Sequence, residues 1–157
     1  MSTNAELYAQ DFYAWCLTTA TLIRAGKWQD VDPEALAEEV ESLGKSDWRE
    51  LASRIAVLIR HLLKWRYQPE RRQRGRSWRS TIWEQRSRLR RLLRQSPSLA
   101  PLVPQTLQEE YAEARQRASE ETGLPLPTFP EACPWTAEQV FDADFWPEAD
   151  TSEALSR

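Results

Sequence analysis

Hydrophobic residues recur along most of the chain every three or four positions, which is the spacing of one face of an α-helix. Residues 12–25 form the first such stretch, and Gly26 after them is a typical residue beyond a helix end. A second helix is expected to begin at Asp32-Pro33, where an N-cap residue precedes a proline in the first helical position. Gly44 is expected to end this helix. Its apolar stripe consists of Leu36, Val40 and Leu43.

A third helix is expected from Ser46 or Asp47 to just before Pro69, because a residue preceding proline is disfavoured in helical geometry. Its apolar positions alternate in steps of three and four, which indicates packing against other helices. These positions are Trp48, Leu51, Ile55, Leu58, Leu62 and Trp65. After a basic connector, Ser77 is expected to cap a fourth helix that ends near the sequence QSPSL.

The last third of the chain is expected to contain one more long helix and an extended segment. The helix begins at Ser98 or, because proline is disfavoured inside a helix, near Pro104, and it ends at Gly123. Five of the ten prolines then follow, together with several large apolar side chains. We therefore expect an extended strap laid over the helices, with one short helix capped by Thr136 and reinforced by Gln139.

These elements predict an all-α protein. We expect a single-domain, mostly antiparallel bundle of about five helices with an extended proline-rich C-terminal strap. A chain of 157 residues is long enough to bury a core in one domain, to which we assign residues 1–147. The polar residues 148–157 are expected to fray.

The net charge of −3 hides a strong separation of charge along the chain. Residues 60–94 contain thirteen Lys and Arg residues and two acids, whereas the rest of the chain contains eight and twenty-two. The charge of the whole chain therefore says little about its partners, and the basic segment has to be considered by itself.

Two interpretations of this basic segment remain open. In the first, arginines and exposed rings contact an acidic protein or a nucleic acid. The candidates for this contact are Arg71, Arg72, Arg74, Arg76 and Trp83. Trp83 lies about 100° from the apolar stripe of its helix in ideal geometry, which favours an exposed ring, whereas Trp65 and Trp78 fall on apolar stripes. In the second interpretation, the bases pair with acids of neighbouring helices, including the run from Glu109 to Glu121.

A smaller set of polar residues lies at the edges of apolar stripes. Glu39 has this position on the second expected helix, and Gln85 and Arg86 have it on the fourth. We expect these three residues to form a partly buried structural network in which Glu39 pairs with Arg86. The alternative is a general acid or a metal ligand at Glu39.

His61 is the only histidine, which excludes two-histidine and Cys-His metal sites in a monomer. Arg54 precedes it by seven residues, about 10.5 Å along a helix and on nearly the same face. This Arg-x6-His spacing resembles the motif of HEPN-type ribonucleases, in which the pair handles the RNA phosphate. Arg54 and His61 are therefore candidate catalytic residues of a metal-independent ribonuclease. The alternative is a histidine that is hydrogen-bonded to a neighbour and has no catalytic role.

Other kinds of chemistry gain little support from the sequence. Cys16 falls on an apolar stripe and Cys133 has no basic neighbour in sequence, so neither is typical of an activated nucleophile. There is no glycine-rich phosphate loop or dinucleotide motif, and no cofactor or metal ion is expected. Because the chain has neither a long apolar run nor a signal-peptide pattern, we expect a cytoplasmic protein without membrane contact.

Several ordered pieces of the sequence carry a resemblance to a known family. The pieces DFYAW, LAEEVESLG, SWRSTIWEQR and CPW…FWP resemble a bacterial family, abundant in cyanobacteria, known as domain of unknown function 29. The likeness runs from about Tyr8 to Pro147, and it implies an all-helical, stand-alone protein without an assigned activity. Our expectation is a non-enzymatic interaction module that contacts an acidic protein or a nucleic acid through residues 60–94. Whether it forms a homodimer is left open.

Overall fold

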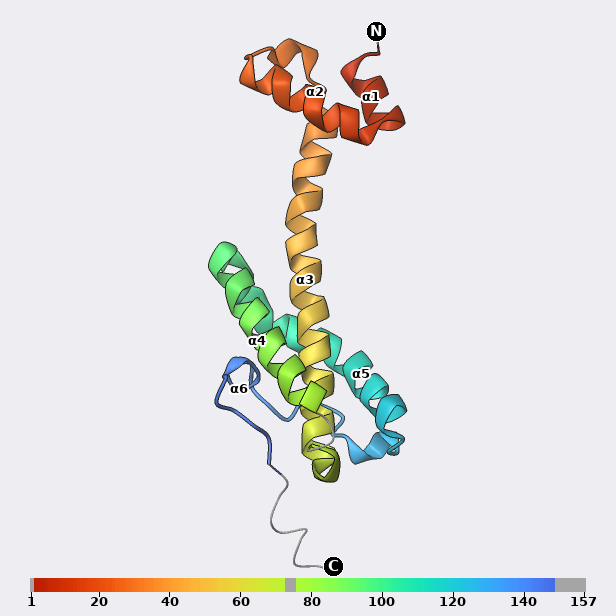
Figure 1. Ribbon diagram of the computed structural model, residues 1–157, viewed down its shortest axis with the longest axis vertical. Coiled ribbons are helices and arrows are strands. Elements are labelled where there is room, and N and C mark those ends of the chain that lie inside the picture. The colour runs from red at the N-terminus through yellow and green to blue at the C-terminus, as the bar shows by residue number, and fades with distance from the viewer. Residues whose placement is uncertain (1, 73–75, 149–157) are drawn as a thin grey trace, which may run out of the picture. The chain divides into compact units, whose positions relative to one another are not determined.

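The computed structural model describes residues 2–72 and 76–148, and every regular element in these ranges is helical (Figure 1). The all-α prediction is therefore confirmed. Contacts divide the chain into two compact units, Met1–Ser46 and Asp47–Arg157, and α3 (Pro33–Tyr67) contributes residues to both. The single domain expected over residues 1–147 stays a prediction. Of the tail expected at 148–157, residues 149–157 lie outside the described ranges.

The first unit contains α1 (Asn4–Gln10), α2 (Phe12–Arg24), a short 3-10 turn η1 (Trp28–Asp30) and the first part of α3. Helix α2 agrees with the prediction, whereas α1 was not expected. The reason is that α1 has only seven residues and two large apolar side chains, Leu7 and Tyr8, which is too short a segment for a repeated helical spacing. A capping box between Thr3 and Glu6 defines its start instead.

A half-buried asparagine, Asn4, links the elements of the first unit. The side chain of Asn4 donates to Thr19 Oγ1 at 2.9 Å and accepts from Trp15 Nε1 at 3.1 Å and from the backbone N–H of Asp32 at 2.9 Å. These bonds join α1, α2 and the residue before α3. The buried side chains of this unit are few, namely Trp15, Thr19, Val31 and Ala35.

The apolar stripes predicted in the first unit are less buried than their spacing suggests. Val40 and Leu43 belong to the expected inward stripe of α3, yet Leu43 is 71% exposed and Val40 is exposed as well. Phe12 of α2 is also exposed. Helical spacing here identifies the apolar face correctly but does not show whether anything covers it.

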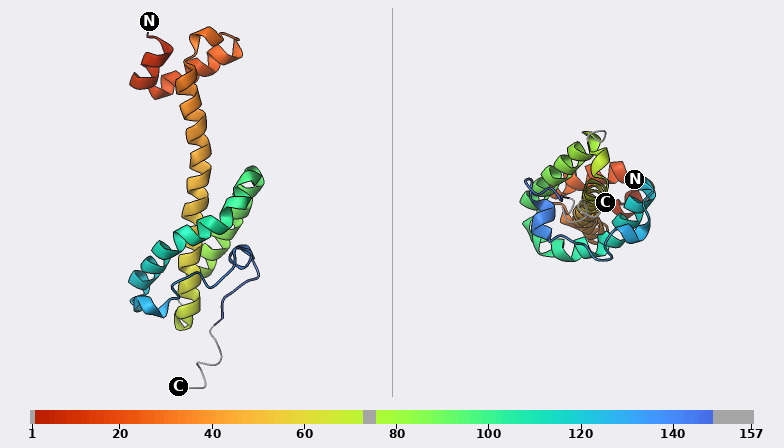
Figure 2. Two further views of the ribbon diagram at one scale, coloured as in Figure 1. Left: turned by 180° about the vertical axis from the view of Figure 1, so that it is seen from behind. Right: turned by 90° about the horizontal axis from the view of Figure 1, so that it is seen from below.

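The second unit contains the larger core, formed by the remainder of α3 with α4 (Arg76–Gln95) and α5 (Val103–Thr122). Helix α4 runs back along α3 in the opposite direction, and α4 and α5 flank this part of α3 (Figures 1 and 2). Short 3-10 turns precede α4 and α5, namely η2 (Pro69–Arg71) and η3 (Pro97–Leu102). The most completely buried aliphatic side chains of the second unit include Leu51, Ile55, Leu58, Leu62, Ile82 and Leu89.

Two predicted helix ends are wrong. Gly44 does not end a helix, because α3 continues from Pro33 to Tyr67 as one element. Among the described glycines only Gly26 and Gly123 have a positive φ, and a glycine in helical geometry costs only about 1 kcal/mol relative to alanine. Ser77 is not an N-cap, because α4 already includes Arg76 and places the serine in its first turn.

The C-terminal part of the second unit agrees more closely with the sequence. Helix α5 begins at Val103, so that Pro104 lies in its first turn, and it ends before Gly123, whose φ is 75°. Residues 124–148, which we call the strap, follow with a short turn η4 (Leu126–Thr128) and the helix α6 (Ala137–Phe141). The predicted capping box of Thr136 and Gln139 is present at the start of α6. Two strap residues, Phe129 and Val140, are fully buried in the core.

Candidate binding surface

Three arginines of the basic segment hold the strap, and we call them the strap arginines: Arg72, Arg79 and Arg86. Arg86 is 1% exposed, and it donates from Nε to the carbonyl oxygen of Val140 at 2.8 Å and from Nη2 to that of Gln139 at 3.5 Å. Its guanidinium also lies 5.5 Å from the ring centroid of Trp146. Burial lowers the pKa of Arg86 below its usual range. The buried guanidinium is therefore a bridge between α4 and the strap.

Arg72 and Arg79 make further contacts with the strap. Arg72 donates to the carbonyl oxygens of Trp65 at 2.7 Å and Pro147 at 3.2 Å, and it forms an ion pair with Glu148 at 3.2 Å. Its guanidinium lies over the ring of Trp65, and that of Arg79 lies over the ring of Trp146. Arg72 was predicted to contact a partner, but in the structure its side chain is engaged within the fold.

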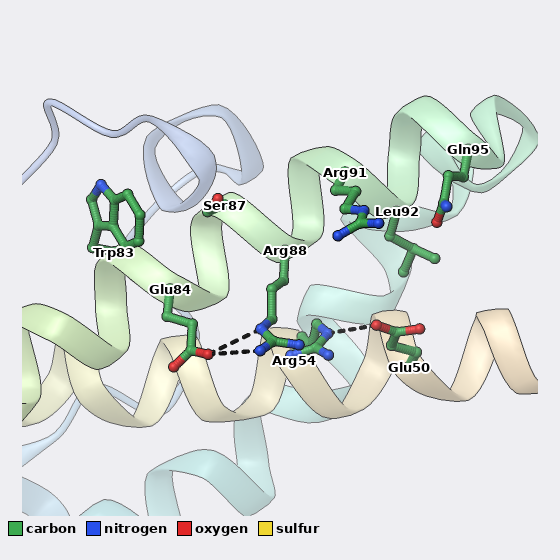
Figure 3. A pocket seen from close by; sticks show the side chains of 9 residues that line it. All are labelled: Glu50, Arg54, Trp83, Glu84, Ser87, Arg88, Arg91, Leu92 and Gln95. Carbon is green, nitrogen blue, oxygen red and sulfur yellow. Dashed lines mark hydrogen bonds and ion pairs between the residues drawn. The ribbon is translucent and has the colours of Figure 1, made fainter.

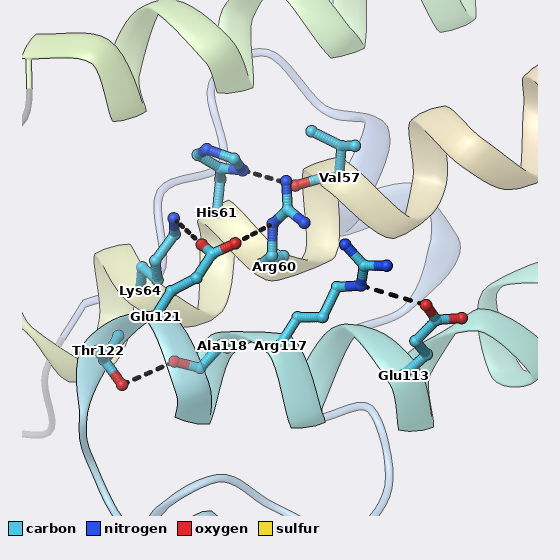
Figure 4. A network of polar contacts seen from close by, with 9 residues as sticks. All are labelled: Val57, Arg60, His61, Lys64, Glu113, Arg117, Ala118, Glu121 and Thr122. Carbon is cyan, nitrogen blue, oxygen red and sulfur yellow. Dashed lines mark hydrogen bonds and ion pairs between the residues drawn. The ribbon is translucent and has the colours of Figure 1, made fainter.

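A second group of bases pairs with α5 (Figure 4). Glu121 accepts from Lys64 Nζ at 2.5 Å, and its other carboxylate oxygen lies 3.5 Å from Arg60 Nε. Lys64 is buried and also lies over the ring of Trp78. The acidic run of α5 was expected to supply counter-charge, and Glu121 does so for these two bases.

The C-terminal half of α4 is different. Arg90, Arg91 and Arg94, which we call the outer arginines, are exposed, and no ion pair or hydrogen bond of their side chains occurs with the described residues. Helix α4 contains seven arginines and a single acid, Glu84. That acid is engaged by Arg88, whose Nη2 lies 3.0 Å from it. The charge of the outer arginines is thus directed to solvent.

Trp83 lies beside these arginines on the same helix. Its side chain is 64% exposed, as its position away from the apolar stripe predicts. In ideal helical geometry Arg90 and Arg94 project within about 20° of Trp83, about 10 and 16 Å further along the axis. We call Trp83 with the outer arginines the outer face of α4. The sequence-based candidates included Trp83 but missed all three outer arginines, although their spacing from Trp83 was a signal for them.

A groove of about 430 Å³ lies between α3 and α4 next to this face (Figure 3). Arg54 reaches into it from α3, donating to Glu50 at 2.8 Å and to Gln85 Oε1 at 3.2 Å. Trp83 and Arg91 line the groove from α4. The complete lining is Glu50, Arg54, Trp83, Glu84, Ser87, Arg88, Arg91, Leu92 and Gln95.

The other sequence candidate for catalysis, His61, is not among the residues that line this groove. Its Nδ1 lies 2.8 Å from the carbonyl oxygen of Val57, one turn earlier in α3 (Figure 4). Burial, together with the charges of Lys64 and Arg60, lowers the pKa of His61 to about 4. The ribonuclease hypothesis for Arg54 and His61 therefore stays a prediction that rests on the sequence motif.

The predicted polar network has different partners from those expected. Glu39 accepts a hydrogen bond of 2.6 Å from the hydroxyl of Tyr8, which raises the pKa of that tyrosine to about 12. Gln85 accepts from Arg54, and Arg86 donates to the strap. Each of the three residues has a hydrogen bond within the fold. Glu39 and Arg86 do not pair with each other as expected, because Glu39 pairs with Tyr8 and Arg86 with the strap.

The connector between α3 and α4 is described only in part. Arg71 is exposed at the end of η2. Arg74 lies outside the described residues, and so does the side chain of Arg76, the first residue of α4. The predicted role of these three arginines in partner contact stays a prediction.

No other arrangement in the described part of the chain indicates a chemical centre. Within residues 2–72 and 76–148, no three His, Cys, Asp or Glu side chains gather as metal ligands would. Burial raises the pKa of the Cys133 thiol, which disfavours a reactive thiolate. None of the helices in these ranges combines the length and the apolar composition that a membrane span requires.

Comparisons with known proteins give one match. Residues 7–146 match the family described as Domain of unknown function DUF29. No curated protein and no solved structure matches the chain. The match covers nearly all of the described helices and the strap up to Trp146, including the acceptors of Arg86. The chain therefore belongs to the DUF29 family, as the resemblance of its sequence implies.

Proposed function

We propose that the protein is a non-enzymatic helical interaction module that binds an acidic partner, a protein or a nucleic acid, through the outer face of α4. The observation that supports this most is the exposure of Arg90, Arg91 and Arg94 without an acidic partner among the described residues. Charge runs on helices are usually solvated faces. Here, however, Arg79, Arg86 and Arg88 on the same helix have partners within the fold, and these three do not.

The contrast with the rest of the segment strengthens the proposal. Arg60 and Lys64 share Glu121, and the strap arginines contact carbonyl oxygens, tryptophan rings or Glu148. Three exposed arginines without an acidic partner among the described residues produce a positive potential that attracts polyanions and accelerates their association. An exposed tryptophan beside them adds a contact that charge alone does not provide.

The proposal is tested by binding of the full chain to two labelled polyanions at low salt. The probes are an oligothymidine of about 20 nucleotides and poly-L-glutamate, and fluorescence anisotropy measures the affinity. We expect at least one probe to bind the wild type, and the triple variant R90Q/R91Q/R94Q to bind it at least about tenfold more weakly. The outer arginines are exposed, so this variant should fold as the wild type does.

A matched control removes the same charge elsewhere. Arg24, Lys27 and Arg117 are exposed and lie outside α4, so R24Q/K27Q/R117Q has the net charge of the test variant. The control variant should keep the affinity of the wild type. Absence of binding by the wild type, or equal losses in both variants, would show that the outer face is not a binding surface.

A further inference from the structure

We infer that the partner of the outer face is a single strand of nucleic acid, with one base stacked on Trp83 and phosphates bound by the outer arginines. This inference rests on the proposed function. It adds the class of the partner and the role of the ring. Three observations support it: the exposure of the indole, the lack of another exposed large apolar side chain among the described residues of α4, and the position of the arginines.

The indole of Trp83 is suited to base stacking because of where it lies. It is 64% exposed on a helix whose other exposed described side chains are arginine, serine, glutamine and Glu84, and Glu84 pairs with Arg88. No ring or cation contact of Trp83 occurs with the described residues, whereas the rings of Trp65 and Trp146 pack against each other in a tilted pair, 4.7 Å between centroids, and have guanidinium groups over them. The aromatic face of Trp83 is therefore accessible to a ligand.

An acidic protein partner fits this surface less well. The buried centre of a protein interface is rich in apolar side chains, with charged residues at its rim. Among the described side chains of α4, Trp83 is the one large apolar group that is exposed. Arginines lie on both sides of it along the helix, at Arg79 and Arg90. A lone ring between cations is instead typical of single-strand binding, in which nucleobases stack on aromatic side chains and phosphates contact arginines and lysines.

A double-stranded nucleic acid would not explain the exposed ring of Trp83. In a duplex the faces of the bases are covered by their neighbours, so that only unpaired bases can stack on a side chain. The positions of Arg90 and Arg94, about 10 and 16 Å along the axis from Trp83, allow a strand to follow α4 while one of its bases lies on the indole. Arg91 lines the adjacent groove and offers a further contact to the strand.

The experiment compares two tryptophan variants of the full chain. W83A removes the proposed stacking ring, and W28A removes an equally exposed indole, since Trp28 is 60% exposed in the first unit. The ligands are the labelled oligothymidine, a duplex of equal length and poly-L-glutamate. We expect W83A to weaken oligothymidine binding by about 5- to 100-fold and to leave poly-L-glutamate binding unchanged. W28A should bind all three ligands as the wild type does, and W83F should recover most of the lost affinity.

The outcomes separate this inference from the proposed function. If W83A binds oligothymidine as tightly as the wild type, or loses poly-L-glutamate to the same degree, the stacking inference is overturned while the outer arginines keep their proposed role. Tighter binding of the duplex or of poly-L-glutamate than of oligothymidine by the wild type would also overturn it. If no ligand binds at low salt, the proposed function fails as well.

Discussion

Arg86 and Arg90 lie one helical turn apart on α4 but have opposite surroundings. Arg86 is 1% exposed and donates to the carbonyl oxygens of Val140 and Gln139, whereas Arg90 is exposed and has no partner among the described residues. The same contrast separates the strap arginines from the outer arginines. Arg72 and Arg86 replace water by protein acceptors during folding and Arg79 contacts a strap ring, whereas the outer arginines keep their hydration and their charge for a partner.

This contrast shows why a count of charges did not decide between binding and self-neutralisation. Some basic residues of the segment are paired within the fold and others are exposed, so each of the two interpretations, self-neutralisation and partner contact, fits a different part of the segment. Arg60 and Lys64 pair with Glu121, and Arg72 pairs with Glu148 and also donates to backbone carbonyl oxygens. The hydrogen bonds of Arg86 go to backbone carbonyl oxygens. On α4, the exposed arginines that have no ion pair, hydrogen bond or ring contact with the described residues are Arg90, Arg91 and Arg94, in its C-terminal half.

The largest effect on folding is expected from Arg86→Ala. The substitution removes a buried guanidinium and leaves the carbonyl oxygen of Val140 without its donor, so the free energy of unfolding should fall by about 3 kcal/mol. Arg90→Ala, one turn away, should change it by less than about 0.5 kcal/mol. Urea denaturation followed by circular dichroism measures both. Similar decreases in the free energy of unfolding for the two variants would contradict the distinction between strap and outer arginines.

A somewhat smaller effect is expected from the protonation of His61. Its pKa is about 4 in the folded protein, below the usual 6.5, so between these values the unfolded chain binds a proton that the folded chain does not. Stability from this group is complete above pH 6.5 and is lost as the pH falls toward 4, by about 2 to 3 kcal/mol. Arg60, Lys64 and Glu121 are the charged groups around it.

The comparison with His61→Gln isolates this contribution. The difference in unfolding free energy between wild type and H61Q should decrease steadily from pH 7 to pH 4, as measured by urea denaturation at each pH. A difference that stays constant over this range would mean that folding does not lower the pKa of His61, and would contradict its burial among uncompensated surroundings.

Much of the fold could be predicted because local rules and packing agree. The heptad-like spacing from Leu51 to Leu62 identified a fully buried stripe, and Gly123 and Thr136 fixed the ends of two helices through backbone geometry and capping. The exposure of Trp83 followed from its angle on the helix alone. In each case the signal lies within one helix or at its end.

The rest depends on contacts between distant segments, which spacing does not encode. Arg86 bonds to residues more than fifty positions later, and nothing near it in sequence names the strap as its acceptor. The exposed Leu43 shows the converse, since an apolar stripe indicates an inward face only if another element covers it. The outer arginines were not among the candidate residues because their accessibility depends on which segments cover α4, and charge density along the sequence favoured the connector instead.

The most direct test of the account is the salt dependence of oligothymidine binding. Each phosphate neutralised on a single strand contributes about −0.7 to the slope of log K against log salt. The double variant R90Q/R94Q should therefore have a slope shallower than that of the wild type by about 1.4. R24Q/R117Q, with the same net charge, should keep the slope of the wild type. Equal slopes for the two double variants would contradict the assignment of the outer arginines to partner binding.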